Sequence, residues 1–229
     1  MAAVGFQASD LFAQPANFHP QSSSSITNET VTRMLDDQGN SQCSTGGLNS
    51  TTEYTNDFTY CNATPDIATD LNTTLTEFGN VFDSKKMTGL VLGFSAGEYA
   101  TVSITGHQHA ENAHNVGATE GIADVSAAVP AGAGFGVPTL AGQVDGADAS
   151  PVSMTMTFSF NHVDREGEDG NHFVGKNITC RAEVSVEWVG VPTTPEATGW
   201  ETLSQGPNDA NEDFDGYSYT AEKYFDLTP

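Results

Sequence analysis

The stretch that decides the fold is residues 152–189, VSMTMTFSFNHVDREGEDGNHFVGKNITCRAEVSVEWV. Apolar and polar residues alternate in both halves, and the acidic loop DREGEDGNH separates the halves. Sustained alternation is typical of long antiparallel strands that bury one face. The residues expected to face the core are Met154, Met156, Phe158 and Phe160 in the first strand, and Ile178, Cys180, Ala182, Val184, Val186 and Trp188 in the second.

A second hairpin is predicted upstream of this one. Leu90, Leu92 and Phe94 alternate with polar or small residues, a Gly97-Glu98 turn follows, and the alternation resumes at residues 100–104. The Thr-rich residues 38–77 are predicted to form short, exposed strands and loops. No stretch keeps a helical period over three turns. The sequence therefore predicts an all-β fold, a single jelly-roll barrel or sandwich with long loop insertions.

The domain organisation follows from where the alternation starts. Residues 1–30 contain Pro15, Pro20 and a run of four serines, so we expect an extended N-terminal arm there. Phe6, Leu11, Phe12 and Phe18 should anchor that arm on its own domain or on a neighbour. Residues 31–229 are predicted to form one β-barrel domain. An outward projection is expected from part of residues 38–77, residues 106–150, or both.

The charge balance restricts the partners that the chain can bind. Thirty acidic residues face only seven Lys and Arg, which gives a formal charge of -23, yet only 16% of residues are charged. Average proteins carry about 25%, so the surface is poor in basic residues rather than crowded with charge. This balance favours a surface adapted to molar salt. The basic residues form no cluster beyond Lys85-Lys86, so we expect no direct binding of nucleic acid.

A histidine-rich stretch, ITGHQHAENAH at residues 104–114, is the candidate metal site. His107, His109 and His114 are weak candidate ligands, with Glu111 beside them. The cupin enzymes use a similar His-x-His pattern, but Glu111 follows too closely and Phe135 stands where their later histidine would be. We therefore interpret these histidines as polar or interfacial. The sequence shows no catalytic motif, so we predict no enzyme, no metal and no cofactor.

Cysteines and glycosylation sequons carry less information. Cys43 and Cys61 lie in one polar segment and could form a disulfide, whereas Cys180 is expected to be a small buried residue. Sequons occur at Asn28, Asn49, Asn62, Asn72 and Asn177, and they matter only if the chain is exported. The first twenty residues lack a basic region and a long apolar run. We therefore expect synthesis in a host cytoplasm without a signal peptide.

Taken over the whole chain, the size, acidity, all-β pattern and absence of a signal resemble the major capsid proteins of haloarchaeal icosahedral viruses that enclose an internal membrane. The larger of their two major capsid proteins is the closer match. The resemblance implies an upright single jelly roll that tiles the virion shell together with a second capsid protein in pseudo-hexameric capsomers. It also implies contact of this chain with its own copies, and of the arm with a neighbour or the internal membrane.

Two other classes of function stay open. The chain could be a halophilic cell-envelope or carbohydrate-binding β-sandwich, for which the sequons and the aromatic residues Trp200, Tyr217 and Tyr219 are the motivation. It could also be a metal-dependent jelly-roll enzyme that uses the histidine-rich stretch. Glycan occupancy would favour the first alternative, and bound metal that is lost in a His107→Ala, His109→Ala variant would favour the second.

The charge balance makes a direct prediction about salt. Dilution to about 0.1 M salt lengthens the Debye length to about 10 Å, so the carboxylates then repel one another. We expect oligomers to dissociate and the melting temperature to fall relative to molar KCl. Sedimentation velocity and thermal unfolding at both salt concentrations check this, and identical melting curves would contradict the halophilic interpretation.

Overall fold

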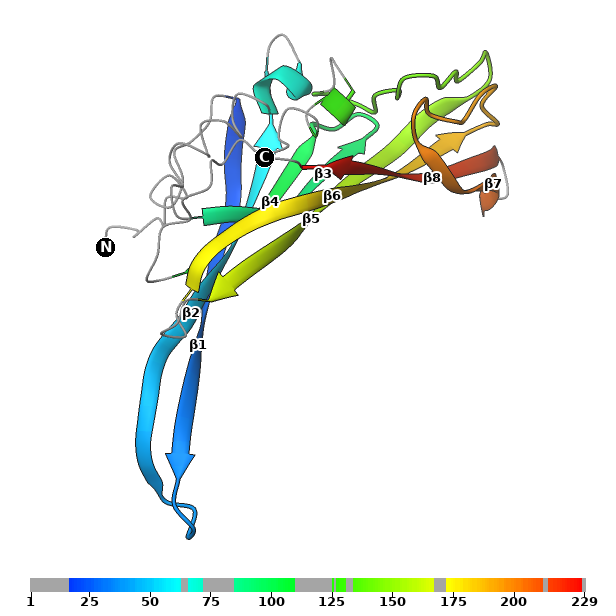
Figure 1. Cartoon of the computed structure of the whole chain (residues 1–229). Coiled ribbons are helices and arrows are strands. Elements are labelled where there is room, and N and C mark those ends of the chain that lie inside the picture. The colour runs from blue at the N-terminus through cyan, green and yellow to red at the C-terminus, as the bar shows by residue number, and fades with distance from the viewer. Residues whose placement is uncertain are drawn as a thin grey trace, which may run out of the picture.

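The computed structural model describes residues 17–62, 66–71, 85–109, 125, 127–130, 134–166, 172–211 and 214–227. Eight strands account for most of these residues (Figure 1). Their bounds are β1 Phe18–Leu35, β2 Ser41–Tyr60, β3 Lys85–Ser95, β4 Thr101–His109, β5 Ser150–Glu166, β6 His172–Val189, β7 Glu201–Asn211 and β8 Phe214–Asp226.

The strands form one curved sheet in the order β1-β2-β4-β3-β5-β6-β8-β7, and every neighbouring pair is antiparallel. The predicted all-β class is confirmed, and eight antiparallel strands are compatible with a jelly roll or sandwich. Four hairpins, β1-β2, β3-β4, β5-β6 and β7-β8, lie side by side. Among the described residues, β1 and β7 are the two outer strands of the sheet.

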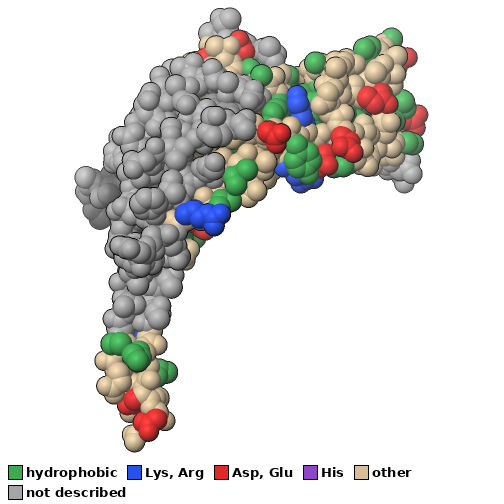
Figure 2. Space-filling view, viewed as in Figure 1, with side chains coloured by type: hydrophobic (Ala, Val, Ile, Leu, Met, Phe, Trp, Pro, Cys, Tyr) green, Lys and Arg blue, Asp and Glu red, His purple; other side chains and the backbone are tan. Residues whose placement is uncertain are grey.

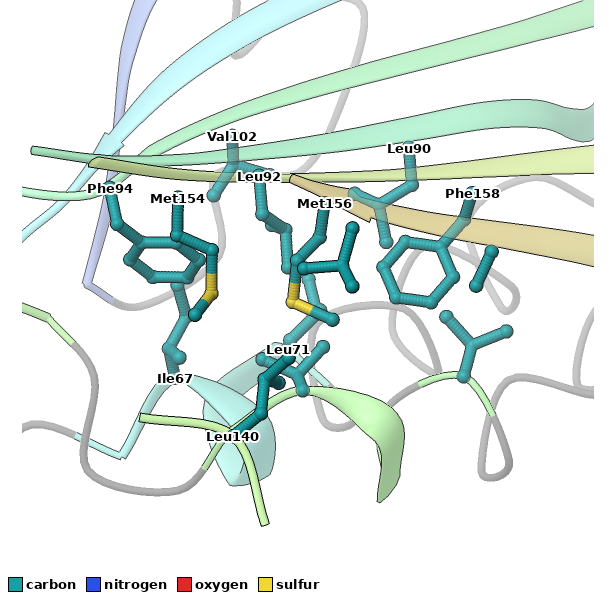
Figure 3. Close-up of a cluster of buried hydrophobic side chains, with 14 of the residues drawn as sticks. Ile67, Leu71, Leu90, Leu92, Phe94, Val102, Leu140, Met154, Met156 and Phe158 are labelled. Carbon is teal, nitrogen blue, oxygen red and sulfur yellow. The ribbon is translucent and has the colours of Figure 1, made fainter. Parts of the chain in front are cut away.

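The predicted alternation decides which face of the sheet is buried. Leu92 on β3 lies opposite Val102 on β4 and Met156 on β5, and all three are fully or almost fully buried. Their side chains point to the same face as Leu90, Phe94, Met154 and Phe158 (Figure 3). Burying a large apolar side chain contributes about 1.5–3 kcal/mol, so this face dominates the stability of the fold.

A thin layer of chain covers the buried face. A short helix at residues 67–71 places Ile67 and Leu71 against the sheet, and Leu140 reaches it from the loop before β5 (Figure 3). The same core cluster contains Phe18 near one end of the described chain and Leu227 at the other. One continuous core therefore joins β1, β2, β3, β4, β5, β6 and β8, whereas none of the described residues of β7 belongs to it.

The prediction for Ile178 is wrong, although the rest of its strand alternates as expected. Ile178 is 40% exposed, while Asn177 is buried. The pairing of β5 with β6 shifts there, from Asn161 opposite Thr179 to His162 opposite Asn177. This β-bulge leaves Ile178 without an opposite residue on β5 and shifts the alternation before it by one residue, so that Asn177 takes the buried position.

The N-terminal part of the chain also differs from the prediction. Residues 18–30 belong to β1 and pair with β2, so this part of the predicted arm is a strand of the sheet. Phe18 does anchor the segment, because it is buried against Phe58 and Tyr60 of its own domain. Residues 1–16, with Phe6, Leu11 and Phe12, lie outside the described residues. The backbone of a serine-rich segment can pair with a neighbouring strand, because the exposed side chains of an outer strand need not be apolar.

The prediction of short strands and loops over residues 38–77 is wrong for residues 41–60, which form one strand of 20 residues. Its last part is anchored by Phe58 and Tyr60, which are buried in the core. Its first part pairs with β1 alone among the described residues. A long strand is therefore possible without a long apolar pattern, because a neighbouring strand supplies the hydrogen bonds.

The opposite face of the central strands is lined by small polar residues. Thr101 and Thr105 on β4 lie across from Gly93 and Gly89 on β3. A Cβ atom added at either glycine would lie 2.6 Å from the facing threonine Oγ1, closer than real Cβ contacts. The two threonines therefore occupy the space that side chains on β3 would need.

Two adjacent residues on β3 test the assignment of the two faces. Leu92→Ala should lower the free energy of unfolding by about 3–5 kcal/mol, because it leaves a cavity in the core. Val91→Ala is the matched control, since Val91 is 37% exposed on the opposite face, and it should change stability by less than about 1 kcal/mol. Denaturant unfolding in molar KCl measures both, and equal losses would contradict the assignment.

Candidate functional site

A two-stranded ribbon, which we define as residues 29–50, extends away from the rest of the sheet (Figure 1). The pairing of β1 with β2 continues to Leu35 opposite Ser41, whereas β4 pairs with β2 only over Thr51–Thr59. Two-stranded hairpins are at best marginally stable alone in water. Contact with another surface would therefore stabilise the ribbon.

The tip of the ribbon is a turn organised by Asp36. Its Oδ1 accepts hydrogen bonds from the backbone N–H groups of Gln38 (3.0 Å) and Asn40 (2.7 Å), and its Oδ2 accepts one from Gln42 Nε2 (2.9 Å). Gly39 has a positive φ of 82°, which a glycine adopts without strain. The bonds from the Asn40 backbone and the Gln42 side chain lower the pKa of the Asp36 carboxyl. The turn therefore has a defined conformation.

Apolar side chains flank this turn. Met34 is 65% exposed and Leu35 is 57% exposed, and Cys43 is exposed beside them, with its Sγ 3.7 Å from Met34 Sδ. Figure 2 shows hydrophobic and acidic side chains together at the end of the ribbon. Exposed apolar side chains therefore lie beside a turn of defined conformation.

The structure does not allow the predicted disulfide between Cys43 and Cys61. Both thiols are free, and they lie near opposite ends of β2. Eighteen residues of extended strand separate them by about 60 Å, whereas a disulfide needs Cα atoms within about 7 Å. The pairing is therefore corrected: the shared polar composition of the segment concealed one continuous strand. Cys180 is buried as predicted, and burial raises the pKa of its thiol to about 12.

The histidine-rich stretch lies at the end of β4. His107 pairs with Glu53 on β2 and Lys86 on β3, and its ring contacts His162 of β5, with the ring centroids 4.4 Å apart. His162 Nδ1 and Asn177 Oδ1 share a hydrogen bond of 2.8 Å, and Asn177 Nδ2 donates to the Met87 carbonyl (3.2 Å). These contacts tie the end of β5 to β6 and β3.

The structure thus brings His107 together with His162, a neighbour that sequence reasoning missed. Continuing the alternation of β5 beyond Phe160 would have pointed to it. The side chain of His109, and all of Glu111 and His114, lie outside what the structure describes. Among the described residues, no three His, Cys, Asp or Glu side chains group as metal ligands would.

The aromatic residues that motivated a binding module are not the exposed ones. Tyr219 is fully buried, and its hydroxyl accepts a hydrogen bond from the Ala197 N–H (3.1 Å). Trp200 and Tyr217 are half-buried against the core. Tyr99 and Phe135 are exposed instead, and their rings meet edge to face at 5.1 Å.

The sequons also differ in accessibility. Asn177 is buried, and Asn62 Nδ2 donates to Asp70 Oδ2 (2.8 Å), beside the Tyr60 hydroxyl that donates to the same oxygen (2.7 Å). Burial and the Asp70 carboxylate raise the pKa of Tyr60. Asn28 is exposed, whereas the side chain of Asn49 and the whole of Asn72 are not among the described parts. Asn28 is therefore the sequon with an accessible side chain in the described chain.

No protein-family model matches the chain, and no curated protein is similar enough in sequence to indicate a relative. Within the described residues, no helix is long and apolar enough to cross a membrane.

Alkylation of the three cysteines tests this arrangement. At pH 8, iodoacetamide should modify Cys43 first and Cys180 at least about a hundredfold more slowly, because burial keeps that thiol protonated. In the unfolded chain, the Cys180 thiol ionises near its ordinary pKa of 9.0, whereas in the folded chain it stays protonated to higher pH. The free energy of unfolding is therefore unaffected by this thiol below pH 9 and falls as the pH rises above 9. Peptide mass spectrometry measures the rates, and a disulfide-linked Cys43–Cys61 peptide from monomeric protein would contradict the assignment.

Proposed function

We propose that the chain is a structural subunit of a protein shell, namely a major capsid protein of an icosahedral virus from a hypersaline environment. The observation that carries the proposal is the ribbon, which extends past the sheet and presents Met34 and Leu35 to solvent at a defined turn. On its own, such a two-stranded extension is at best marginally stable in water. A subunit that tiles a shell uses extensions of this kind to contact its neighbours.

Three further properties support this proposal. The described chain has one continuous core under a long sheet, which gives the rigidity that a tile needs. The net charge of -23 fits assembly in molar salt, where screening acts over about 3 Å. The sequence carries no catalytic motif. In this proposal the ribbon is the expected projection, and the partners are other copies of the chain and a second capsid protein in pseudo-hexameric capsomers.

The proposal also assigns a place to the protein. In this proposal the protein resides in the virion capsid. The part of the chain that faces the interior of the shell would contact an internal membrane. Direct binding of nucleic acid has no place in it, because the seven basic residues are dispersed. Arg181, for example, forms ion pairs with Glu222 (2.7 Å) and Glu183 (2.7 Å), and the hydrogen bond that Arg181 Nε donates to the Glu222 carboxylate raises the pKa of Arg181.

A carbohydrate-binding module of a cell envelope is the second candidate. The exposed ring pair Tyr99 and Phe135 favours it, because aromatic faces form platforms for sugar rings, and the accessible Asn28 is compatible with an exported protein. This candidate predicts glycan at Asn28 and recovery of the chain from the cell envelope.

Mass spectrometry of a density-gradient band separates the two candidates. In a hypersaline culture that carries the gene, the capsid proposal expects this chain among the most abundant proteins of particles that contain lipid and DNA. Its absence from such particles, together with its presence in the envelope fraction, would overturn the capsid proposal in favour of the envelope module.

Substitutions at the ribbon tip test the observation behind the proposal. Met34→Ser with Leu35→Ser should weaken assembly in molar KCl by at least about tenfold in concentration, since the loss of two apolar contacts exceeds about 1.4 kcal/mol. Val191→Ser with Leu203→Ser is the matched control, because it removes two equally exposed apolar side chains elsewhere. Light scattering and sedimentation measure the protein concentration at which assembly begins. Equal effects of the two pairs of substitutions would contradict the role of the ribbon.

A further inference from the structure

The two outer strands of the sheet differ in how they are protected from other strands. β7 carries Glu201, Asp209 and Pro207, and its pairing with β8 shifts between Thr202 and Ser204. Gln205 Nε2 also donates to Glu196 Oε1 (3.1 Å), which brings a loop carboxylate beside this edge. Charges, proline and bulges are the features that prevent a sheet edge from pairing with another chain.

β1 lacks these features over its regular part. Residues 22–28, SSSSITN, pair with residues 57–51 of β2 in seven consecutive pairs without a shift, and β2 is backed by β4 over the same residues. Most of these side chains are exposed, and Ile26 is 61% exposed. The segment contains no proline and no charged residue, in a chain with 30 acidic residues. It is a straight, uncharged edge on a rigid support.

We propose that β1 pairs antiparallel with β1 of a second copy of this chain, about a twofold axis at Ser25. Ser25 is the midpoint of the regular segment, so Ser24 would lie opposite Ile26 of the second copy and Ser22 opposite Asn28. The outer side of β1 faces no other described strand, and its backbone hydrogen bonds would then join the two sheets into one.

Charge identifies a second copy as the occupant of this edge. In a twofold contact both edges carry the same residues, so acidic residues on this edge would add negative charge to both sides of the contact. A cationic partner would instead be drawn to the acidic surfaces elsewhere. The uncharged segment is thus suited to self-contact. Glu29, the first acidic residue of β1, would lie opposite the neutral Gln21, and molar salt screens Glu53 and Asp57 on β2.

This inference rests on the sheet edge alone and goes beyond the proposed function, because such a pair can form in solution as well as within a shell. Seven residues from each copy make a contact smaller than a standard protein interface. We therefore expect the dimer at high protein concentration in molar KCl. It should dissociate when the protein or the salt is diluted.

Two proline variants of the full chain test the pairing. Along a strand the N–H groups alternate between the two sides, so one of Ser24→Pro and Ser25→Pro removes a bond to β2 and the other removes only an outward N–H. The variant that keeps the native melting temperature should stay monomeric in sedimentation velocity. The matched controls are Ser204→Pro and Gln205→Pro on β7, of which the thermally native one should dimerise like the unaltered chain.

Hydrogen exchange of the unaltered chain provides a second readout. The outward amides of residues 22–28 should exchange quickly in dilute protein and be protected at high concentration. A chain that stays monomeric up to its solubility limit with fast exchange at these amides, or a thermally native proline variant that still dimerises, would overturn the inference. Particles whose residues 22–28 exchange quickly would overturn only the pairing. A protected edge in a chain that never enters particles would overturn only the proposed function.

Discussion

A row of buried side chains that crosses six strands is the constraint on which the rest of the structure depends. It runs through Phe58, Val102, Leu92, Met156, Val184 and Ala221, each opposite the next. Because side chains alternate between faces, a slip of one residue between any two strands would move a whole strand's apolar set into water. The row therefore fixes the register of strands that have little apolar pattern of their own.

The surfaces assigned to assembly lie where this row ends. Among the described side chains, those of residues 21–28 and 33–43 are not buried, and Phe18, Phe58 and Tyr60 connect these segments to the core. The central strands β3 and β4 contain no acidic residue. A rigid sheet with extensions that lack their own core is consistent with a protein that completes its structure by contact with neighbours.

The sequence predicted the strands in which apolar and polar residues alternate. It did not predict the outer strands, which do not require such alternation. β3, β4, β5 and β6 each bury one face, and their period of two was evident. β1 and β7 were missed because an outer strand is held by hydrogen bonds on one side, which serine, asparagine and even Pro207 allow. Three further features were not predicted, because they depend on pairing between distant segments. They are the bulge at Ile178, the contact of His107 with His162, and the length of β2, which separates Cys43 from Cys61.

The close approach of Thr101 to Gly93 and of Thr105 to Gly89 has a consequence for how this sequence can change over time. At positions 89 and 93, even alanine would collide with the threonine already across the strand. A larger residue there requires the facing threonine side chain to turn away or to be replaced by a smaller one. Each glycine and its threonine are therefore expected to be inherited as a unit and to vary together among descendants of this chain, although neither residue touches the core.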